Sequence, residues 1–352
     1  MSRFFSKSLQ NLEAYTPGEQ PKDNKYIKLN TNESPFIPPK KVMKRVLKNA
    51  NKLNLYPDPE CYELREKLSK TLGVDKDEII LGNGSDEVLN FIFKAFCDNT
   101  IDAAFADITY GFYEVFANLY NINYQKIPLK NDFSIDEEDY FNLGKTIFIA
   151  NPNAPTGLFM PLDKIEKILK NNPQNIVVID EAYVDFGAKS AIKLIKKYDN
   201  LIVCRTFSKS RQMAGARLGF AISNKEIIKD LNKIRYSLNP YNINRMTMEA
   251  ALCILDNERL VKKNIKKIIE ARKYTITELK KLDFEITDSK ANFIFAKHKK
   301  LAGEEIYTKL KQRGILVRHF NKDKISAYNR ITIGTKGEMC ALIESLKVIL
   351  ED

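Results

Sequence analysis

Residues 201–220 read LIVCRTFSKSRQMAGARLGF, a short apolar run that leads into a cluster of polar side chains. The run from Leu201 to Cys204 has the length and composition of a buried β-strand. An α/β sheet places its chemistry outside the carboxyl ends of its strands, which is where this cluster lies. The polar residues that can act together there are Thr206, Ser208, Lys209 and Arg217. The stretch therefore predicts an α/β fold with functional side chains at one edge of the sheet.

An amine flanked by hydroxyls and an arginine suits a phosphorylated aldehyde. Lys209 can form an imine with the aldehyde, while the hydroxyls and Arg217 bind the phosphate. Pyridoxal phosphate (PLP) has this chemistry. The alternative is a solvated lysine next to a serine, which is common, so the decision depends on whether other segments supply the remaining parts of a PLP site.

Length and composition are those of an ordinary globular protein. The chain has 352 residues, of which 44% are hydrophobic and 29% charged, so we expect two domains with a sizeable core. No apolar run approaches the roughly 20 residues that cross a bilayer, and the N-terminus lacks a signal-peptide core. We therefore expect a cytoplasmic protein with no membrane partner.

Charge, cysteines and histidines exclude several functions. The net charge of +12 comes mainly from lysines spread along expected helices, not from an arginine-rich stripe, so we expect no nucleic-acid partner. It can instead attract an anionic substrate. The five cysteines are scattered and expected to be reduced. With only two histidines, a metal site is not expected and a Ser-His-Asp hydrolase is disfavoured.

The sequence IILGNGSDE from Ile79 predicts a strand, a glycine-rich turn and a helix, with Ser85 or Asp86 as the helix N-cap. Such a turn presents free backbone amides to an anion, so we expect the cofactor phosphate near Gly84. Glu87 occupies the position of the third glycine of a dinucleotide-binding motif, which argues against NAD. Any capped β-α turn would have a similar sequence.

A second chemical signal follows the apolar run 176–179, which ends in Asp180 and, three residues later, Tyr183. A carboxylate at the end of a buried strand is costly unless it meets a cation. The protonated pyridine nitrogen of PLP is such a cation. Asp180 is therefore expected to face the same ligand as Lys209.

Four further residues are candidates with a structural alternative. Tyr110 follows a predicted strand and can stack on a flat ring or pack in the core. Asn153, in the proline-rich turn NPNAPTG, can bond a ligand oxygen or simply belong to a loop. Tyr56 lies between two helices as a ligand contact or a packing anchor. Arg330 begins a strand and has the fork geometry that binds a carboxylate.

Periodicity and turn residues divide the chain into an N-terminal arm (1–40), a large domain (41–255) and a smaller α+β domain (256–352). The expected strands are 26–29, 79–81, 101–106, 146–150, 176–179, 201–204, 218–223, 284–287, 292–296, 315–318 and 330–333. The expected helices are 40–52, 62–72, 162–170, 225–235, 241–255, 259–281, 303–313 and 336–350. A further helix is expected directly after Gly84.

Nine motifs occur along nearly the whole chain. They are AYTPGEQP (14–21), LNTNESP (29–35), YPD (56–58), GNGSDE (82–87), NPNAPTG (151–157), DEAY (180–183), TFSK (206–209), Arg217 with Gly219, and RITIGT (330–335). In this order they resemble the fold-type I, class I and II PLP-dependent aminotransferases. The resemblance implies an α/β large domain with a central, mostly parallel seven-stranded sheet flanked by helices. It also implies a small α+β domain built from the C-terminal part and the N-terminal segment.

The resemblance implies a role for each matching residue. Lys209 would hold PLP and move the proton, Asp180 would pair with the pyridine nitrogen, Tyr183 would meet the phenolic oxygen and Tyr110 would stack on the ring. The phosphate would be surrounded by Gly84, Ser85, Asp86, Thr206, Ser208 and Arg217. The candidate substrate contacts are Arg330, Tyr15, Asn32 and Tyr56, the last from the second subunit of a homodimer.

One position departs from the family pattern. The family usually has an asparagine directly before Pro-Thr-Gly, where it contacts the phenolic oxygen, and this chain has Ala154. Asn153, one residue earlier, is the expected substitute.

The implied reaction is transamination between a small amino donor and a 2-oxo acid, by a ping-pong mechanism through Lys209. The motifs are most like those of family members that act on histidinol phosphate with 2-oxoglutarate. Transamination of an aromatic amino acid and decarboxylation of threonine phosphate on the same scaffold are the alternatives. A non-catalytic binding protein is a further possibility, against which the presence of Lys209, Asp180 and Arg217 argues.

Overall fold

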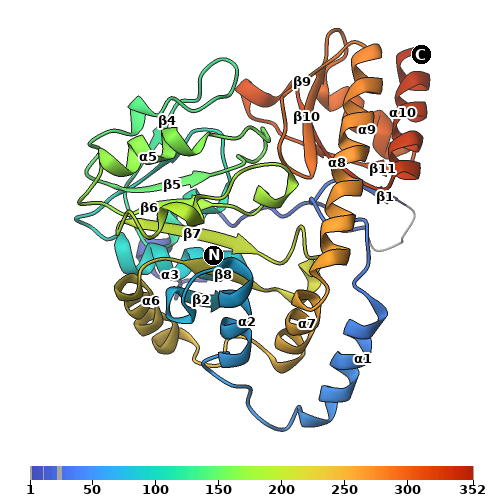
Figure 1. The fold of residues 1–352 in the computed structure, drawn as a ribbon. Helices are drawn as coiled ribbons and strands as arrows, with labels where there is room; N and C mark the ends of the chain where they lie inside the picture. The colour runs from blue at the N-terminus through green and yellow to red at the C-terminus, as the bar shows by residue number, and fades with distance from the viewer. Residues whose placement is uncertain (1, 11, 22–25, 352) are drawn as a thin grey trace.

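A computed structural model describes residues 2–10, 12–21 and 26–351; residues 1, 11 and 22–25 of the expected arm, and residue 352, lie outside the described residues. Its centre is a seven-stranded sheet between two layers of helices (Figure 1). Its strands are β2 (Ile79–Gly82), β3 (Ala103–Ala106), β4 (Tyr124–Ile127), β5 (Thr146–Ala150), β6 (Val177–Asp180), β7 (Leu201–Thr206) and β8 (Gly219–Ile222).

The strand order is β2-β8-β7-β6-β5-β3-β4. Strand β8 runs antiparallel to both of its neighbours, and the other pairs are parallel. Every residue of β5, β6 and β7 is buried, which explains why their sequences are continuous apolar runs and not alternating ones. The expected mostly parallel seven-stranded sheet is confirmed.

Helices cover both faces of this sheet. One face carries α1 (Lys40–Asn49), α2 (Tyr62–Leu72), α5 (Leu162–Lys170) and α7 (Arg245–Leu255). The other carries α3 (Ser85–Phe96), α4 (Phe112–Leu119) and α6 (Lys225–Leu238). With a hydrophobic core on each side, the carboxyl ends of the parallel strands are the edge left for polar chemistry.

A second core belongs to a smaller α+β unit. Its antiparallel sheet has the order β12-β13-β10-β9. These strands are β9 (Phe284–Ile286), β10 (Phe293–His298), β12 (Arg318–His319) and β13 (Asn329–Thr332). Helices α9 (Gly303–Gln312) and α10 (Lys336–Glu351) pack with it, and β1 (Ile27–Lys28) joins β11 (Ile315–Leu316) in parallel. The N-terminal segment is thus part of this unit, as expected.

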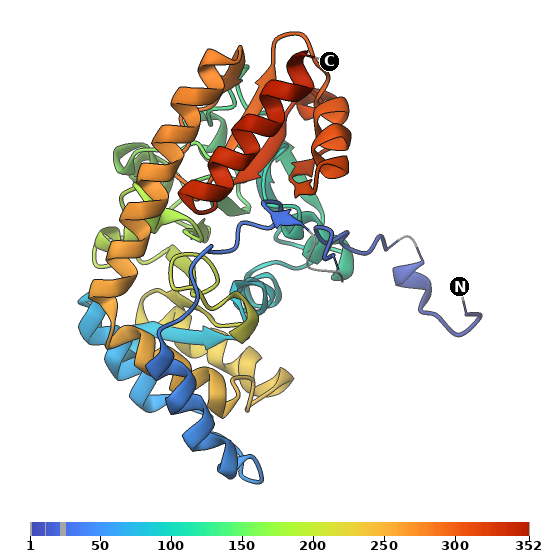
Figure 2. The ribbon, with the colours of Figure 1, turned by 90° about the vertical axis from the view of Figure 1, so that its right-hand side faces the viewer.

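Helix α8 (Glu258–Lys281) runs along both units (Figure 2). Val261, near its start, packs in a core of the large domain, whereas Ile268 and Leu279 pack in the core of the small one. The helix therefore connects the two domains mechanically as well as along the chain.

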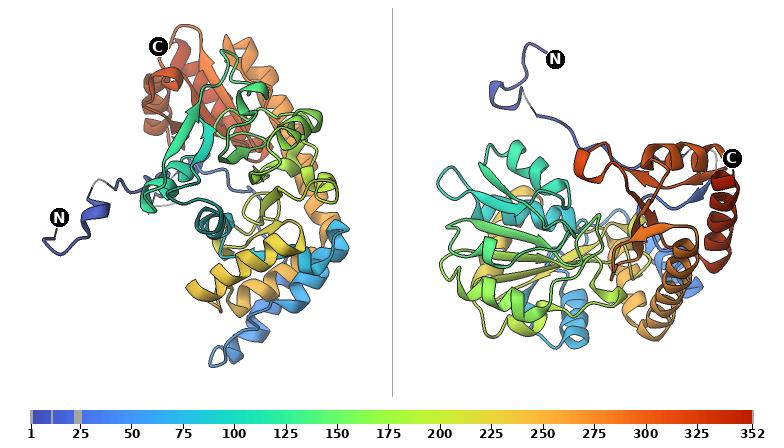
Figure 3. Two further views of the ribbon diagram at one scale, coloured as in Figure 1. Left: turned by 90° about the vertical axis from the view of Figure 1, so that its left-hand side faces the viewer. Right: turned by 90° about the horizontal axis from the view of Figure 1, so that it is seen from above.

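The first residues of the chain extend away from this body (Figures 2 and 3). Residues 7–9 form a single 3-10 turn, and the nearby Phe4 is largely exposed. Among the described residues, no helix is both long and apolar enough to cross a membrane.

Four local expectations needed correction. The N-cap of α3 is Gly84, not Ser85 or Asp86, because the chain turns there with a positive φ of 82°. The expected strand 315–318 is two strands in different sheets, β11 and β12. Helix α7 begins at Arg245, not at 241, because the side chain of Asn244 caps it. Helix α4 and strand β4 were not expected.

Candidate active site

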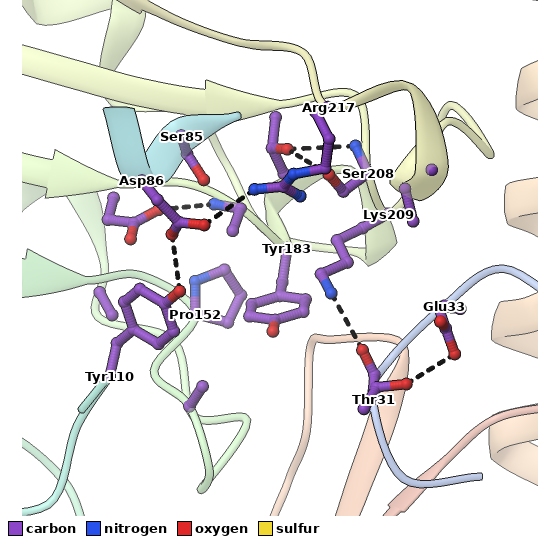
Figure 4. Close-up of a pocket in the computed structure, with 17 residues that line it drawn as sticks. Thr31, Glu33, Ser85, Asp86, Tyr110, Pro152, Tyr183, Ser208, Lys209 and Arg217 are labelled. Atoms are coloured by element: carbon purple, nitrogen blue, oxygen red, sulfur yellow. Dashed lines mark hydrogen bonds and ion pairs between the residues drawn. The ribbon is translucent and has the colours of Figure 1, made fainter. Parts of the chain in front are cut away.

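A cavity of about 330 Å³ opens at the carboxyl ends of β5, β6 and β7 (Figure 4). Lys209, Asp180, Tyr183 and Tyr110 all line it. The expectation that Lys209 and Asp180 share one cavity is therefore met by the structure. The other expected residues that line it are Ser85, Asp86, Thr206, Ser208 and Arg217.

One end of the cavity has the chemistry of an anion site. Helix α3 begins there, and its first residues Ser85 and Asp86 line the cavity. The first backbone amides of a helix lack an intrahelical acceptor, so they suit an anion. Thr206 and Ser208 add hydroxyl groups, whose oxygens lie 3.0 Å apart. Arg217 closes this end, and a Cβ on Gly84 would lie 2.3 Å from its Nη2 atom. Glycine is therefore required at position 84 for the arginine to approach.

The carboxylate of Asp86 accepts hydrogen bonds from two side chains of the cavity, Arg217 and Tyr110. Oδ2 accepts from Arg217 Nη2 at 2.9 Å, and Oδ1 accepts from the Tyr110 hydroxyl at 2.7 Å. Because a carboxylate repels a phosphate, Asp86 suits the anion site through its backbone amide. The side chain instead orients Arg217 and Tyr110.

Asp180 ends β6 as a buried acid that forms no ion pair within the described part of the chain. Burial raises the pKa of its carboxyl to about 6, although the Tyr113 hydroxyl at 3.1 Å and the Ala182 amide donate to it. A positively charged group placed in the cavity would favour the ionised carboxylate and offset this cost. This is the fit that a protonated pyridine nitrogen requires.

Lys209 has the amine that a reacting lysine needs. The pKa of its ε-amino group is lowered to about 8. Burial is the largest cause, and the positive charge of Arg330 is the next. Its Nζ atom donates to the carbonyl oxygen of Thr31 at 3.1 Å and lies 5.9 Å from the centre of the Tyr183 ring. On the order of a tenth of this amine is therefore neutral at pH 7, far more than for a lysine with the ordinary pKa of about 10.4.

This lowered pKa can be tested on the cofactor-free protein. Acylation of Lys209 by a small neutral reagent, followed by mass spectrometry, should rise with pH with a midpoint of about 8, because only the neutral amine reacts. Arg330→Gln removes the largest repulsive charge and should move this midpoint upward. A midpoint near 10 in the unaltered protein would contradict the assignment.

Tyr183 is held by a residue from the N-terminal segment. Asn32 donates from Nδ2 to the Tyr183 hydroxyl at 3.0 Å, and its own Oδ1 accepts from Thr332. Asn32 was predicted as a substrate contact; the structure places its side chain between Tyr183 and β13 of the small domain. The hydroxyl of Tyr183 is thereby oriented by groups from both ends of the chain.

Asn153 and Tyr56, both predicted as ligand contacts, do not line this cavity. The Asn153 amide donates to the Ile108 carbonyl at 2.9 Å and its oxygen accepts from Thr109, so its polar atoms already have protein partners. Ala154 lines the cavity instead. Tyr56 is 78% exposed and stacks on Tyr241, with ring centres 4.4 Å apart.

A second cavity of about 370 Å³ adjoins the first and shares Lys209, Tyr183 and Tyr110 with it. Three of the residues predicted as substrate contacts line it: Arg330, Tyr15 and Asn32. The guanidinium of Arg330 donates to the Asn30 carbonyl at 2.9 Å, but its buried Nε atom has no hydrogen-bond partner among the residues that the structure describes. A cavity with an incompletely bonded arginine is suited to an anionic group.

Several residues in or beside the two cavities were missed by sequence reasoning. Tyr113 lines neither cavity, but its hydroxyl donates to Asp180, and it lies in a helix that was not expected. Arg318, beside Arg330, has no local motif of its own, and Thr31 and Glu33 occur in the motif LNTNESP, from which only Asn32 was chosen as a site residue. The position of Arg318 on the strand next to Arg330 is the one signal that could have found it.

Comparisons with known proteins agree with this geometry. The family model described as aminotransferase class I and II matches residues 24–346. A histidinol-phosphate aminotransferase of Brachyspira hyodysenteriae is 49% identical, over 100% of both chains. One of Clostridium botulinum is 47% identical, over 99% of both. The structure of a histidinol-phosphate aminotransferase from Sinorhizobium meliloti, in complex with pyridoxal-5'-phosphate, has a TM-score of 0.90 at 22% identity, covering 100% of this chain and 98% of that one; it supports the fold.

Proposed function

Because the chain belongs to the class I and II aminotransferases, a PLP-dependent family, we propose that it transfers the amino group of histidinol phosphate to 2-oxoglutarate, or catalyses the reverse reaction. The observation that carries the chemistry is the shared cavity of Lys209 and Asp180. The full-length similarity to histidinol-phosphate aminotransferases supports the substrate.

The residues that would hold PLP are those of the first cavity. The amides at the start of α3, with Ser85, Thr206, Ser208 and Arg217, suit its phosphate. Tyr110 suits the face of its ring and Asp180 its ring nitrogen. When bound, PLP supplies an electron sink that stabilises negative charge at the substrate α-carbon.

The side chains of this protein perform the remaining steps. Lys209 Nζ removes the proton from the substrate α-carbon, which requires the neutral amine that its lowered pKa provides. Asp180 keeps the ring nitrogen protonated through its negative charge. Tyr183, oriented by Asn32, offers its hydroxyl to the phenolic oxygen. Asn153 is left as a weaker candidate for that contact, because its amide group is already bonded to Ile108 and Thr109.

The second cavity suits the anionic end of the substrate. Arg330 and Arg318 line it together, with Tyr15 and Lys322 at its wall. Two arginines are a strong recognition site for a phosphate or a carboxylate, since each presents a planar fork of donors. The same pair can serve the phosphate of one substrate and a carboxylate of the other in alternate half-reactions.

Product identification tests this function. Purified enzyme with histidinol phosphate and 2-oxoglutarate should form glutamate, at a kcat/KM well above that with phenylalanine or tyrosine as donor. Carbon dioxide released from threonine phosphate, without glutamate, would instead identify a decarboxylase. A larger kcat/KM for an aromatic amino acid would reassign the donor.

We also propose a homodimer in which Tyr56 reaches the partner's active site. An exposed apolar surface supports this, since monomeric proteins rarely leave such a surface free. Its residues are Ile37, Met43, Leu47, Leu53, Leu55 and Tyr56. Most of them lie on or next to α1, at one end of the molecule (Figure 2).

Hybrid dimers test the shared site. Lys209→Ala and Tyr56→Ala chains, each with low activity as homodimers, should recover activity when refolded together. One site of each hybrid then contains both intact residues. Mixing two samples of the Lys209→Ala chain is the control. Activity that does not rise on mixing, or a monomer by analytical ultracentrifugation, would contradict the shared site.

We also propose the domain boundaries and a cytoplasmic location. The division into 1–40, 41–255 and 256–352 is supported by the two separate cores, with the last boundary two residues before α8. All five cysteines are free, which suits a reducing compartment such as the cytoplasm.

A further inference from the structure

A cluster of charged side chains lies next to the first cavity but does not line it. Its members are Glu181, Asp185, Arg205, Arg211 and Glu258. The side chains of Arg205 and Arg211 are only 8% and 7% exposed. Buried charges are costly unless they are paired. The side chains of this cluster are therefore held in fixed ion pairs, unlike mobile charged groups on the surface.

Asp185 is the centre of this cluster. Its Oδ1 atom accepts from Arg205 Nη2, and its Oδ2 atom accepts from the Ser210 hydroxyl and from Arg211 Nη1, the latter at 3.2 Å. Burial alone would raise the pKa of Asp185, but the two arginines hold it at about 2. The carboxylate is therefore charged at every pH at which the enzyme would work.

The sequence positions of these partners connect Asp185 with the active site. Asp185 follows Tyr183 by two residues, in the 3-10 turn Val184–Phe186. Ser210 directly follows Lys209. One carboxylate thus joins the loop that carries the tyrosine to the loop that carries the lysine, at a point one residue from the reactive amine.

Arg211 extends the connection to the small domain. Its Nη2 atom donates to Glu258 at 2.9 Å, and Glu258 is the first residue of α8. Since α8 continues into the core of the small domain, the same cluster links Lys209 with the domain that supplies Arg330.

We propose that Asp185 is a positioning residue. Its bonds to Ser210, Arg211 and Arg205 hold Lys209 at a fixed position relative to Tyr183 and to the start of α8. This inference rests on the proposed PLP chemistry at Lys209, and it assigns to Asp185 no contact with substrate or cofactor. Misplacement of a reacting group by about 1 Å can cost on the order of 10²-fold in rate.

The sharpest test is Ser210→Ala, because it cuts the link beside Lys209 and leaves every ion pair of the cluster in place. Ser190→Ala is the matched control: the Ser190 hydroxyl donates to Glu181 at 2.6 Å, in the same cluster but not beside Lys209. Asp185→Asn removes the central charge and is the stronger variant. If Asp185→Asn does not fold, Ser210→Ala still decides the question.

Three quantities are measured on each full-length variant. They are PLP affinity by absorbance titration of the cofactor-free protein, amide hydrogen exchange over residues 207–213, and kcat with KM for the amino donor. Ser210→Ala should weaken PLP binding, speed the exchange and lower kcat about 10-fold, with KM changed less than about threefold. Ser190→Ala should leave all three quantities as in the unaltered protein, and Asp185→Asn should exceed Ser210→Ala.

Unchanged PLP affinity, exchange and kcat in Ser210→Ala would overturn the proposal, as would equal losses in Ser210→Ala and Ser190→Ala. PLP affinity and exchange do not depend on the substrate. If the unaltered protein fails to transaminate histidinol phosphate while Ser210→Ala still loosens PLP and the 207–213 segment, the substrate assignment fails and the positioning role stands.

Discussion

Lys209→Ala should abolish transamination, with a loss of at least about 10⁴-fold in kcat. The variant lacks the amine that holds the cofactor and the group that moves the α-proton. The visible absorption band of PLP bound through Lys209 should disappear from the purified protein. Both effects should appear with a normal circular dichroism spectrum, because the cavity around the lysine tolerates a smaller side chain.

Two controls separate this role from a general effect of charge. Lys209→Arg keeps a positive charge at the same place but cannot react with an aldehyde, so it should be as inactive as the alanine variant. Lys189→Ala, on the exposed surface, should behave as the unaltered enzyme. Undiminished turnover in Lys209→Ala would refute the assigned chemistry altogether.

Asp180→Asn should lower kcat by about 10² to 10⁴-fold while the fold is retained. Asparagine has nearly the shape of aspartate but lacks the negative charge that keeps the ring nitrogen protonated. Tyr113→Phe is the matched comparison, because it removes the hydroxyl that donates to Asp180 and leaves the charge in place. Its effect on kcat should be clearly smaller.

The pH dependence of PLP binding gives an independent measurement of Asp180. The pKa of its carboxyl is about 6 in the cofactor-free protein, so the group is neutral below that pH and charged above it. A cationic ring nitrogen prefers the charged form, and PLP affinity should therefore fall as the pH drops below about 6. Asp180→Asn should lack this step. A step of equal size in the variant would remove Asp180 from that role.

The sequence by itself determined the main elements and the chemical groups. Continuous apolar runs such as Leu201–Cys204 indicated strands buried on both faces, and β7 begins where expected. Lys209 and Asp180 could be predicted because Asp180 directly follows such a run and Lys209 lies five residues after one, and parallel strands bring their carboxyl ends to one edge. These are local signals, and local patterns suffice to detect them.

Only the tertiary structure decided how distant side chains meet. Asn32 bonds Tyr183 across 151 positions, Tyr113 donates to Asp180 across 67, and Arg318 joins Arg330 at one cavity. The same holds for the amide of Asn153, which bonds Ile108 and Thr109 across more than 40 positions, and for the cluster around Asp185. The physical reason is that side-chain direction and pairing depend on how the two domains pack, and no short stretch of sequence contains that information.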